Sequence, residues 1–150
     1  HAARLPLTDQ TPVIEHTNIN LAINSAFIAE MEDVLAAIAD PNILIWDARS
    51  PEEFDGSRVF ANRGGHVPGA INLDWLKTMD RGNNLKLIPQ MQSLLDSRGL
   101  SKGKSIITHC QTHHRSGLTY LIGKMLGYDI RAYHGSWSKW GNDPNTPIGL

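Results

Sequence analysis

This sequence of 150 residues contains a single cysteine, and it lacks the features that mark a membrane or nucleic-acid-binding protein. One cysteine excludes an intrachain disulfide, so packing must hold the fold together. No apolar run approaches the ~20 residues that a membrane-spanning helix needs. The net charge of −1 creates no broad field that would attract nucleic acid or an anionic membrane. We therefore expect a soluble protein with no nucleic-acid or membrane partner, and the choice between cytoplasm and periplasm is left open.

Internal repeats are also missing, and the composition is that of an ordinary globular domain, with 41% hydrophobic and 19% charged residues. A chain of this length forms one domain with a substantial core. Residues 1–24, which include Pro6 and Pro12, favour an extended lead-in or interdomain linker, and residues 25–150 a single domain. Because the chain begins with His1, we expect a processed product or one piece of a longer protein.

Segments typical of strands alternate with segments typical of helices. Strands are predicted over residues 43–46, 70–73, 105–108 and 130–133, and helices over residues 31–38, from Pro51 with Ser50 as N-cap, from Pro89 to Gly99, and from the residues after Cys110 to Gly127. Residues 43–46 form a continuous apolar run, which is typical of a strand buried on both faces. The alternation predicts an α/β fold with an open, mainly parallel sheet.

The most informative segment surrounds Cys110. The predicted strand over residues 105–108 leads into this cysteine, four residues follow, and Arg115 and Ser116 then begin a helical pattern with Leu121 and Met125 among its apolar positions. The backbone N–H groups of such a turn, together with the positive end of the helix, stabilise a thiolate. A lone cysteine is more often an inert buried residue. Its position at the carboxyl end of a strand, where parallel sheets bind ligands, favours a nucleophile here.

Several short motifs occur in a fixed order along the chain. They are Asp47-Ala48-Arg49, Glu53-Phe54, the run from Gly65 to Ala70 leading to Asn72, the segment from Cys110 to Ser116, and Gly135-Ser136-Trp137 with Trp140-Gly141 behind it. In this order they resemble the rhodanese (sulfurtransferase) domain over nearly the whole chain. The last motif resembles most the second, catalytic half of tandem thiosulfate or 3-mercaptopyruvate sulfurtransferases.

The resemblance implies a rhodanese fold, with about five mainly parallel strands and helices on both faces of the sheet. It implies transfer of a sulfane sulfur from a donor such as thiosulfate to cyanide or a thiol, through a persulfide on Cys110. An anion-binding loop, whose backbone N–H groups hold the persulfide, would comprise Gln111, Thr112, His113, His114, Arg115 and Ser116. Supporting residues would be Asp47, Arg49, Trp75, Ser136 and Trp137, with Trp75 in the core or at the pocket rim. The implied partners are a small-molecule sulfur donor, a thiol acceptor and an inactive upstream rhodanese domain, without any cofactor.

The histidines near Cys110 allow a second interpretation. His109, His113, His114 and His134 could gather beside the thiol, and these groups are good ligands for zinc or copper. A metal on Cys110 would occupy the nucleophile, and neighbours on one tight turn rarely converge as a tetrahedron. We therefore predict no metal site. We expect instead that His113 and His114 add partial positive charge beside an anionic donor.

Other functions are weighed against sulfur transfer from thiosulfate. A 3-mercaptopyruvate sulfurtransferase and a non-enzymatic sulfur-carrier or regulatory module are the alternatives. A phosphatase of the same fold is disfavoured, because the phosphatases need five residues between the cysteine and the arginine, and four are present.

One position departs from the pattern of the animal-type thiosulfate enzymes. They carry a donor-binding arginine six residues after the aspartate of the Asp-x-Arg motif, and Glu53 stands at that position here. Either Arg58, Arg63 or Arg81 replaces this arginine, or the natural donor is not thiosulfate.

Overall fold

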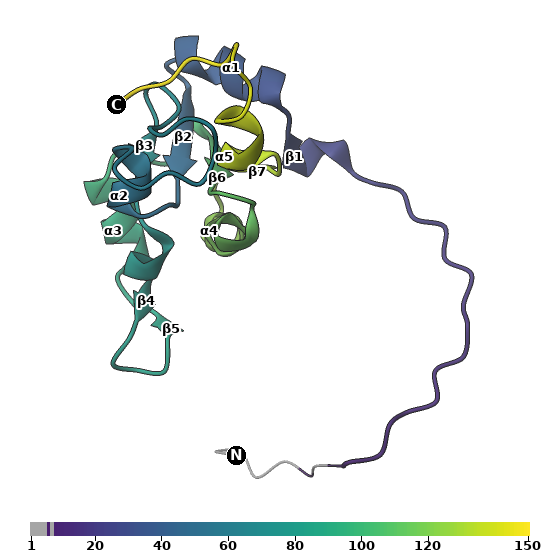
Figure 1. Cartoon of the computed structure of the whole chain (residues 1–150). Helices are drawn as coiled ribbons and strands as arrows, with labels where there is room; N and C mark the ends of the chain where they lie inside the picture. Colours follow the sequence, from purple (N-terminus) through teal and green to yellow (C-terminus); the bar gives the residue numbers. More distant parts are fainter. Residues whose placement is uncertain (1–5, 7) are drawn as a thin grey trace.

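A computed structural model describes residue 6 and residues 8–150. The described part of the predicted lead-in, which ends at Asn24, has neither helix nor strand and exposes all of its side chains. Figure 1 shows it running away from the domain as extended chain. The remainder of that lead-in, residues 1–5 and 7, lies outside the described residues. Regular structure begins with the 3-10 helix η1 (Ser25–Phe27), whose N-cap is Asn24.

A five-stranded sheet of parallel strands forms the centre of the domain. Its strand order is β1-β7-β6-β2-β3, comprising β1 (Ile28–Ala29), β2 (Ile43–Asp47), β3 (Ile71–Asn72), β6 (Ser105–His109) and β7 (Ile130–Tyr133). The four predicted strands are confirmed to within a residue or two at each end. β1 was not predicted, because two residues carry no periodicity. The predicted open α/β sheet is confirmed.

Helices cover both faces of this sheet, as predicted (Figure 1). One face packs against α1 (Met31–Ala39) and α5 (Ser136–Trp140), and the other against α3 (Met91–Ser97) and α4 (His114–Met125). Successive side chains of a strand point to opposite faces, so the apolar runs of β2 and β6 supply both cores. Burial of each large apolar side chain contributes roughly 1.5–3 kcal/mol.

The helix boundaries follow local signals with one exception, and one predicted apolar face is partly exposed. Ser50 caps α2 (Pro51–Phe54) and exchanges hydrogen bonds with Glu53 in a capping box. The next helix starts at Met91 rather than at Pro89, because residues 89 and 90 form a turn before it. On α4, Leu121 and Met125 are 51% and 67% exposed, so these two positions are not part of the buried face.

A small hairpin was not predicted. It consists of β4 (Met79–Asp80) and β5 (Lys86–Leu87), follows the 3-10 helix η2 (Trp75–Thr78), and projects from the sheet region (Figure 1). Its strands are two residues long, too short for an alternating pattern. Among the described residues, no helix is long and apolar enough to cross a bilayer.

Candidate active site

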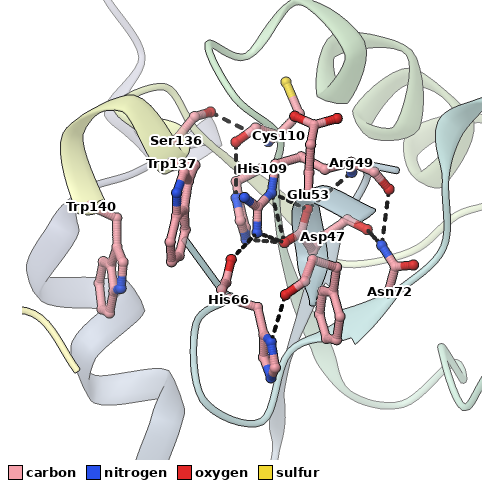
Figure 2. A network of polar contacts seen from close by, with 12 residues as sticks. Asp47, Arg49, Glu53, His66, Asn72, His109, Cys110, Ser136, Trp137 and Trp140 are labelled. Atoms are coloured by element: carbon pink, nitrogen blue, oxygen red, sulfur yellow. Dashed lines mark hydrogen bonds and ion pairs between the residues drawn. The ribbon is translucent and has the colours of Figure 1, made fainter. Parts of the chain in front are cut away.

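The carboxyl ends of β2 and β6 lie side by side and bring two distant motifs together. Asp47 is the register partner of His109, and the N–H of Ala48 donates to the carbonyl of His109 at 2.9 Å. The Asp-x-Arg motif therefore lies directly beside the strand end that carries Cys110. Figure 2 shows Asp47, Arg49 and His109 clustered beneath the cysteine.

The start of α5 holds the backbone around Cys110. The N–H of Trp137 donates to the carbonyl of Cys110, and the N–H of Ser138 to the carbonyl of Gln111, both at 2.9 Å. Ser136 Oγ accepts from the N–H of Cys110 at 3.4 Å and donates to the carbonyl of Tyr133 at 2.9 Å. Cys110 itself is only 1% exposed. The structure thus brings Ser136 and Trp137 to the candidate loop, residues 110–116, which we call the Cys110 loop.

The backbone N–H groups of the Cys110 loop are available to bind an anion. His113, at the N-cap of α4, has a left-handed φ of 67°, and its carbonyl accepts from Gly117 N–H at 2.9 Å. Within the part of the chain that the structure describes, the N–H groups of residues 111–116 donate to no other protein group. Unpaired amides at a helix N-terminus form a binding site for an anion.

An ion pair lies beneath the Cys110 loop. Both oxygens of Asp47 accept from Arg49 Nε at 3.0 Å, and the two side chains are 0% and 1% exposed. Arg49 also donates to the carbonyl of Gly65 at 2.8 Å and stacks over Trp137 at 4.3 Å. Burial alone would raise the pKa of Asp47, but His109 and Arg49 together hold it below its ordinary value. The pair is enclosed by protein on every side.

A second ion pair lies at the mouth of the site. Arg115 donates two hydrogen bonds to the carboxylate of Glu53, at 2.6 and 2.7 Å. The Glu53 side chain is 4% exposed and that of Arg115 25%. Burial raises the pKa of Glu53, but Arg115 outweighs it and the net shift is downward. Figure 2 shows the Glu53 carboxylate and the Cys110 sulfur pointing to the same side.

Cys110 also acts on Arg115. Glu53 has the largest effect in raising the pKa of Arg115, and Cys110 adds to it. Arg115 therefore interacts with the Glu53 carboxylate and feels the nearby thiol, so the site carries a carboxylate where the animal-type thiosulfate enzymes have an arginine.

Of the three predicted substitutes for the missing arginine, Arg63 has its guanidinium engaged away from the thiol. Arg63 donates to the carbonyls of Trp140 and Thr146 at 3.1 and 3.0 Å, so its guanidinium fixes the C-terminal segment. Arg58 and Arg81 are exposed, and Arg81 lies at the β4–β5 hairpin. The arginine beside the thiol is Arg115, already paired with Glu53.

The histidines behave differently from one another. His109 is buried beneath Cys110, with Nδ1 3.2 Å from its carbonyl oxygen, and burial lowers the pKa of the imidazole. His113 stacks on His134 with ring centroids 4.4 Å apart. Burial and the neighbouring histidines lower the pKa of His113 from 6.5 to about 4. The expectation that His113 adds positive charge at neutral pH is therefore wrong, because its ring is neutral there.

The remaining predicted residues have simpler surroundings. Thr112 and His114 are exposed and interact with each other at 3.0 Å, while the Gln111 side chain donates to the carbonyl of Phe60. Ser116 is buried and hydrogen-bonds to His113 at 2.8 Å. Trp75 is half-buried in η2, and its N–H donates to the carbonyl of Ala48. Across the described residues, no group of three or more His, Cys, Asp and Glu is arranged to hold a metal.

Sequence reasoning missed the pairing of Glu53 with Arg115, although it did place His134 near His113. Glu53 and Arg115 are 62 residues apart, and His134 approaches His113 only through the packing of β7 beside β6. No local pattern indicates the contact between Glu53 and Arg115. The available signal was Glu53 itself, a carboxylate at the position where the animal-type thiosulfate enzymes carry an arginine.

Comparison with known proteins decides the family. The model of the rhodanese-like domain matches residues 30–143 of this chain. The chain belongs to the rhodanese family. A relative of this rhodanese domain, the thiosulfate sulfurtransferase of Azotobacter vinelandii, is 42% identical over 97% of the chain and 54% of its own length. The thiosulfate sulfurtransferase of Pseudomonas aeruginosa is 46% identical over 80% of the chain and 45% of its own length.

Solved structures agree on the rhodanese fold. A structure of EanB with a cysteine persulfide and ergothioneine has a TM-score of 0.86 at 17% identity, covering 99% of this chain and 38% of that one. The anaerobic ergothioneine biosynthesis enzyme from Chlorobium limicola gives 0.70 at 16% identity, covering 83% and 32%. At such identity the likeness concerns the fold alone. The rhodanese domain described here spans about half the length of the curated relatives it matches.

Proposed function

We propose that this rhodanese domain is a sulfurtransferase, which moves a sulfane sulfur from a donor such as thiosulfate to a thiophilic acceptor through a persulfide on Cys110. The observation that carries the proposal is the place of Cys110. It directly follows the end of β6 and lies three residues before His113, the N-cap of α4, beside backbone N–H groups that have no protein acceptor within the described chain. The names of the relatives from Azotobacter vinelandii and Pseudomonas aeruginosa support the same activity.

In the first half-reaction the Cys110 thiolate attacks the outer sulfur of thiosulfate. A bond forms between Sγ and this sulfur, and the sulfur–sulfur bond of the donor breaks with its electron pair remaining on sulfite. The charge balances, because a thiolate and a dianion become a persulfide anion and a dianion. In the second half-reaction cyanide or a thiol takes the outer sulfur and restores the thiolate. This is covalent, two-step catalysis without a cofactor.

The Cys110 loop supplies electrostatic stabilisation in this scheme. The anion to be held is the persulfide, and the N–H groups from Gln111 to Ser116 are its donors. Preorganised backbone donors stabilise such an anion more than water does, and removal of one typically costs about 10²–10³ in rate. His114, Thr112 and the half-buried Trp75 are proposed to border the donor, with Trp75 at the rim.

The other predicted residues act on the shape of the Cys110 loop. Asp47 and Arg49 are proposed to support it from below, because their ion pair fills the space beside the end of β6. Ser136 and Trp137 are proposed to fix its carbonyl side through the contacts of α5. These four are positioning residues in the proposal, since none is placed to touch the donor.

The domain organisation is also part of the proposal. Residues 1–24 would be a lead-in or interdomain linker, and residues 25–150 the catalytic half of a longer tandem protein. The length of the relatives supports this division, since the chain covers only 54% and 45% of two of them. An inactive upstream rhodanese domain would then border the site. The proposed location is the cytoplasm or the periplasm.

Intact mass spectrometry tests the activity directly. The protein is measured after incubation with thiosulfate, and again after addition of cyanide. We expect the gain of one sulfur atom, mapped to Cys110 by peptide analysis and removed by cyanide. The Cys110→Ser variant, with a hydroxyl in place of the thiol, is the matched control and should gain no sulfur.

Three other results would change or contradict the proposal. Sulfur gained from 3-mercaptopyruvate but not from thiosulfate would assign the alternative donor. Sulfur gained by Cys110→Ser would contradict the covalent mechanism, because a residue other than Cys110 would then carry the sulfur. A gain from neither donor would favour a sulfur-carrier or regulatory module that is charged by a protein partner.

A further inference from the structure

We propose that Glu53 is a specificity-determining residue, which cancels the charge of Arg115 beside Cys110 and so shifts the site away from doubly charged donors toward singly charged ones. The inference rests on the proposed sulfur transfer and deepens it. It concerns the charge of the donor, a property that the Cys110 loop alone does not determine.

The first step of the argument is geometric. Glu53 and Arg115 form a two-point contact at 2.6 and 2.7 Å, the arrangement in which a guanidinium binds a carboxylate most tightly. A dianionic donor such as thiosulfate would bind Arg115 through the same in-plane N–H groups. The carboxylate and the donor therefore compete for one guanidinium, and the carboxylate is already in place.

The second step concerns the charge that remains. Arg115 carries a permanent positive charge, whereas His113 is neutral at neutral pH. With Glu53 ionised, the Glu53–Arg115 pair has no net charge, so an approaching anion is attracted mainly by backbone dipoles. Attraction to dipoles and repulsion from the carboxylate both scale with the charge of the donor. A second negative charge on the donor thus gains less here than it would beside an unpaired arginine.

The third step separates this role from that of a brace. A carboxylate that merely joined α2 to α4 would fit anywhere along the two helices. Glu53 instead pairs with Arg115, whose pKa is also raised by the Cys110 thiol. The Arg115 side chain remains 25% exposed. The enclosed pair of Asp47 and Arg49 shows what a brace looks like in this protein, since both of its members are sealed from solvent.

Two donors allow the charge to be varied while the chemistry stays the same. Thiosulfate is a dianion, and its leaving group is sulfite. Methanethiosulfonate is a monoanion, and its leaving group is methanesulfinate. In both, Cys110 Sγ bonds to the outer sulfur, and the departing sulfur keeps the electron pair of the broken bond. Both reactions leave the same persulfide. The ratio of kcat/KM for the two donors measures charge preference and is independent of the fraction of protein that is active.

The experiment measures this ratio, with cyanide as acceptor, in the unaltered chain, in Glu53→Gln and in Glu52→Gln. Glutamine keeps an acceptor for the N–H of Ser50, which contacts the Glu53 carboxylate at 3.3 Å. In Glu53→Gln we expect the ratio of thiosulfate to methanethiosulfonate to rise about tenfold, mainly through a lower KM for thiosulfate. Tenfold corresponds to about 1.4 kcal/mol. Glu52 is an exposed neighbour on α2, and its substitution should leave the ratio unchanged.

A second variant, which removes the arginine instead of the carboxylate, should move the ratio in the opposite direction. In Arg115→Gln the Glu53 carboxylate is left without its partner, so the ratio should fall rather than rise. An unchanged ratio in Glu53→Gln, or an equal loss of both activities, would make Glu53 a brace and overturn the inference while the proposed function stands. Failure of the unaltered chain to transfer sulfur from either donor would overturn the proposed function, and this inference with it.

Discussion

The protein contains two arginine–carboxylate pairs within one active-site region, and they differ in almost everything except their chemistry. Asp47 and Arg49 are two residues apart in the chain and are sealed beneath the Cys110 loop. Glu53 and Arg115 are 62 residues apart and meet at its mouth, where the arginine is partly exposed. We call the first the buried pair and the second the mouth pair. In the proposed scheme burial, rather than chemical type, separates a pair that supports the site from one that can exchange with a substrate.

The energetic consequence of burial is uneven. Removal of one member of a buried ion pair leaves an uncompensated charge and typically costs about 3–5 kcal/mol. A pair with solvent access is worth about 0–1 kcal/mol, because water takes over from the lost partner. The buried pair should therefore affect folding, and the mouth pair mainly catalysis. The following experiments test this division, from the largest expected effect to the smallest.

Asp47→Ala should cause the largest loss of stability. Arg49 would keep its hydrogen bond to Gly65 and its contact with Trp137 but lose its counter-charge, so the free energy of unfolding should fall by about 3–5 kcal/mol. Urea unfolding followed by tryptophan fluorescence measures this loss. Asp55→Ala, an exposed carboxylate on the neighbouring segment, is the control and should change little. A loss below about 1 kcal/mol would show that the buried pair is not the brace described here.

Arg115→Gln should show the reverse pattern. Sulfur transfer from thiosulfate should fall about 10²-fold, because a positive group beside the persulfide is lost and Glu53 is left facing it. The free energy of unfolding should change by less than half the amount seen in Asp47→Ala. Steady-state rates and urea unfolding on the same preparations give both values. Equal losses of stability in the two variants would contradict the division between the pairs.

The pH dependence of the free energy of unfolding should also differ between the two regions, although this effect is smaller. In the folded protein the pKa of His113, at the mouth, is lowered from 6.5 to about 4. Between these values the unfolded chain binds a proton that the folded chain does not, so the free energy of unfolding falls as the pH falls. Buried His109 acts with the same sign, since its pKa is also lowered.

The His113→Asn variant measures how much of this pH dependence comes from His113 at the mouth and how much from the buried region. Asparagine tolerates the left-handed φ of 67° found at this position, so the backbone should be kept. Urea unfolding between about pH 7 and 5 should give a shallower decline in the variant than in the parent. If the declines are identical, the histidine at the mouth contributes nothing and His109 of the buried region accounts for the whole effect.

The two regions also differ in how far the sequence could predict them. The strand over residues 43–47 is an apolar run, and Ser50, Gly99 and Gly127 are local signals that begin or end helices, so these were predicted correctly. Pairing of Asp47 with Arg49 is nearly local as well. Contacts of this kind depend on a few neighbouring residues, and sequence patterns describe them well.

The mouth pair depends on tertiary structure and could not be predicted. Glu53 meets Arg115 because α2 and α4 follow neighbouring strands, a relation that appears only once β2 and β6 are paired. Arg63 was a candidate for donor binding on its charge, but the C-terminal segment surrounds its guanidinium with carbonyls. The charge of His113 was misjudged for the same reason, since burial and the approach of His134 lower its pKa.

The hydrogen bonds from α5 to the Cys110 loop have a consequence for biosynthesis. The carbonyls of Cys110 and Gln111 accept hydrogen bonds from the N–H groups of Trp137 and Ser138, in the last helix of the rhodanese domain. During translation the Cys110 loop is made before α5. Domains generally complete their folding as units once their last elements emerge. The nascent chain therefore carries its thiol in an unfinished loop, and the site is assembled only as synthesis of the domain comes to a close.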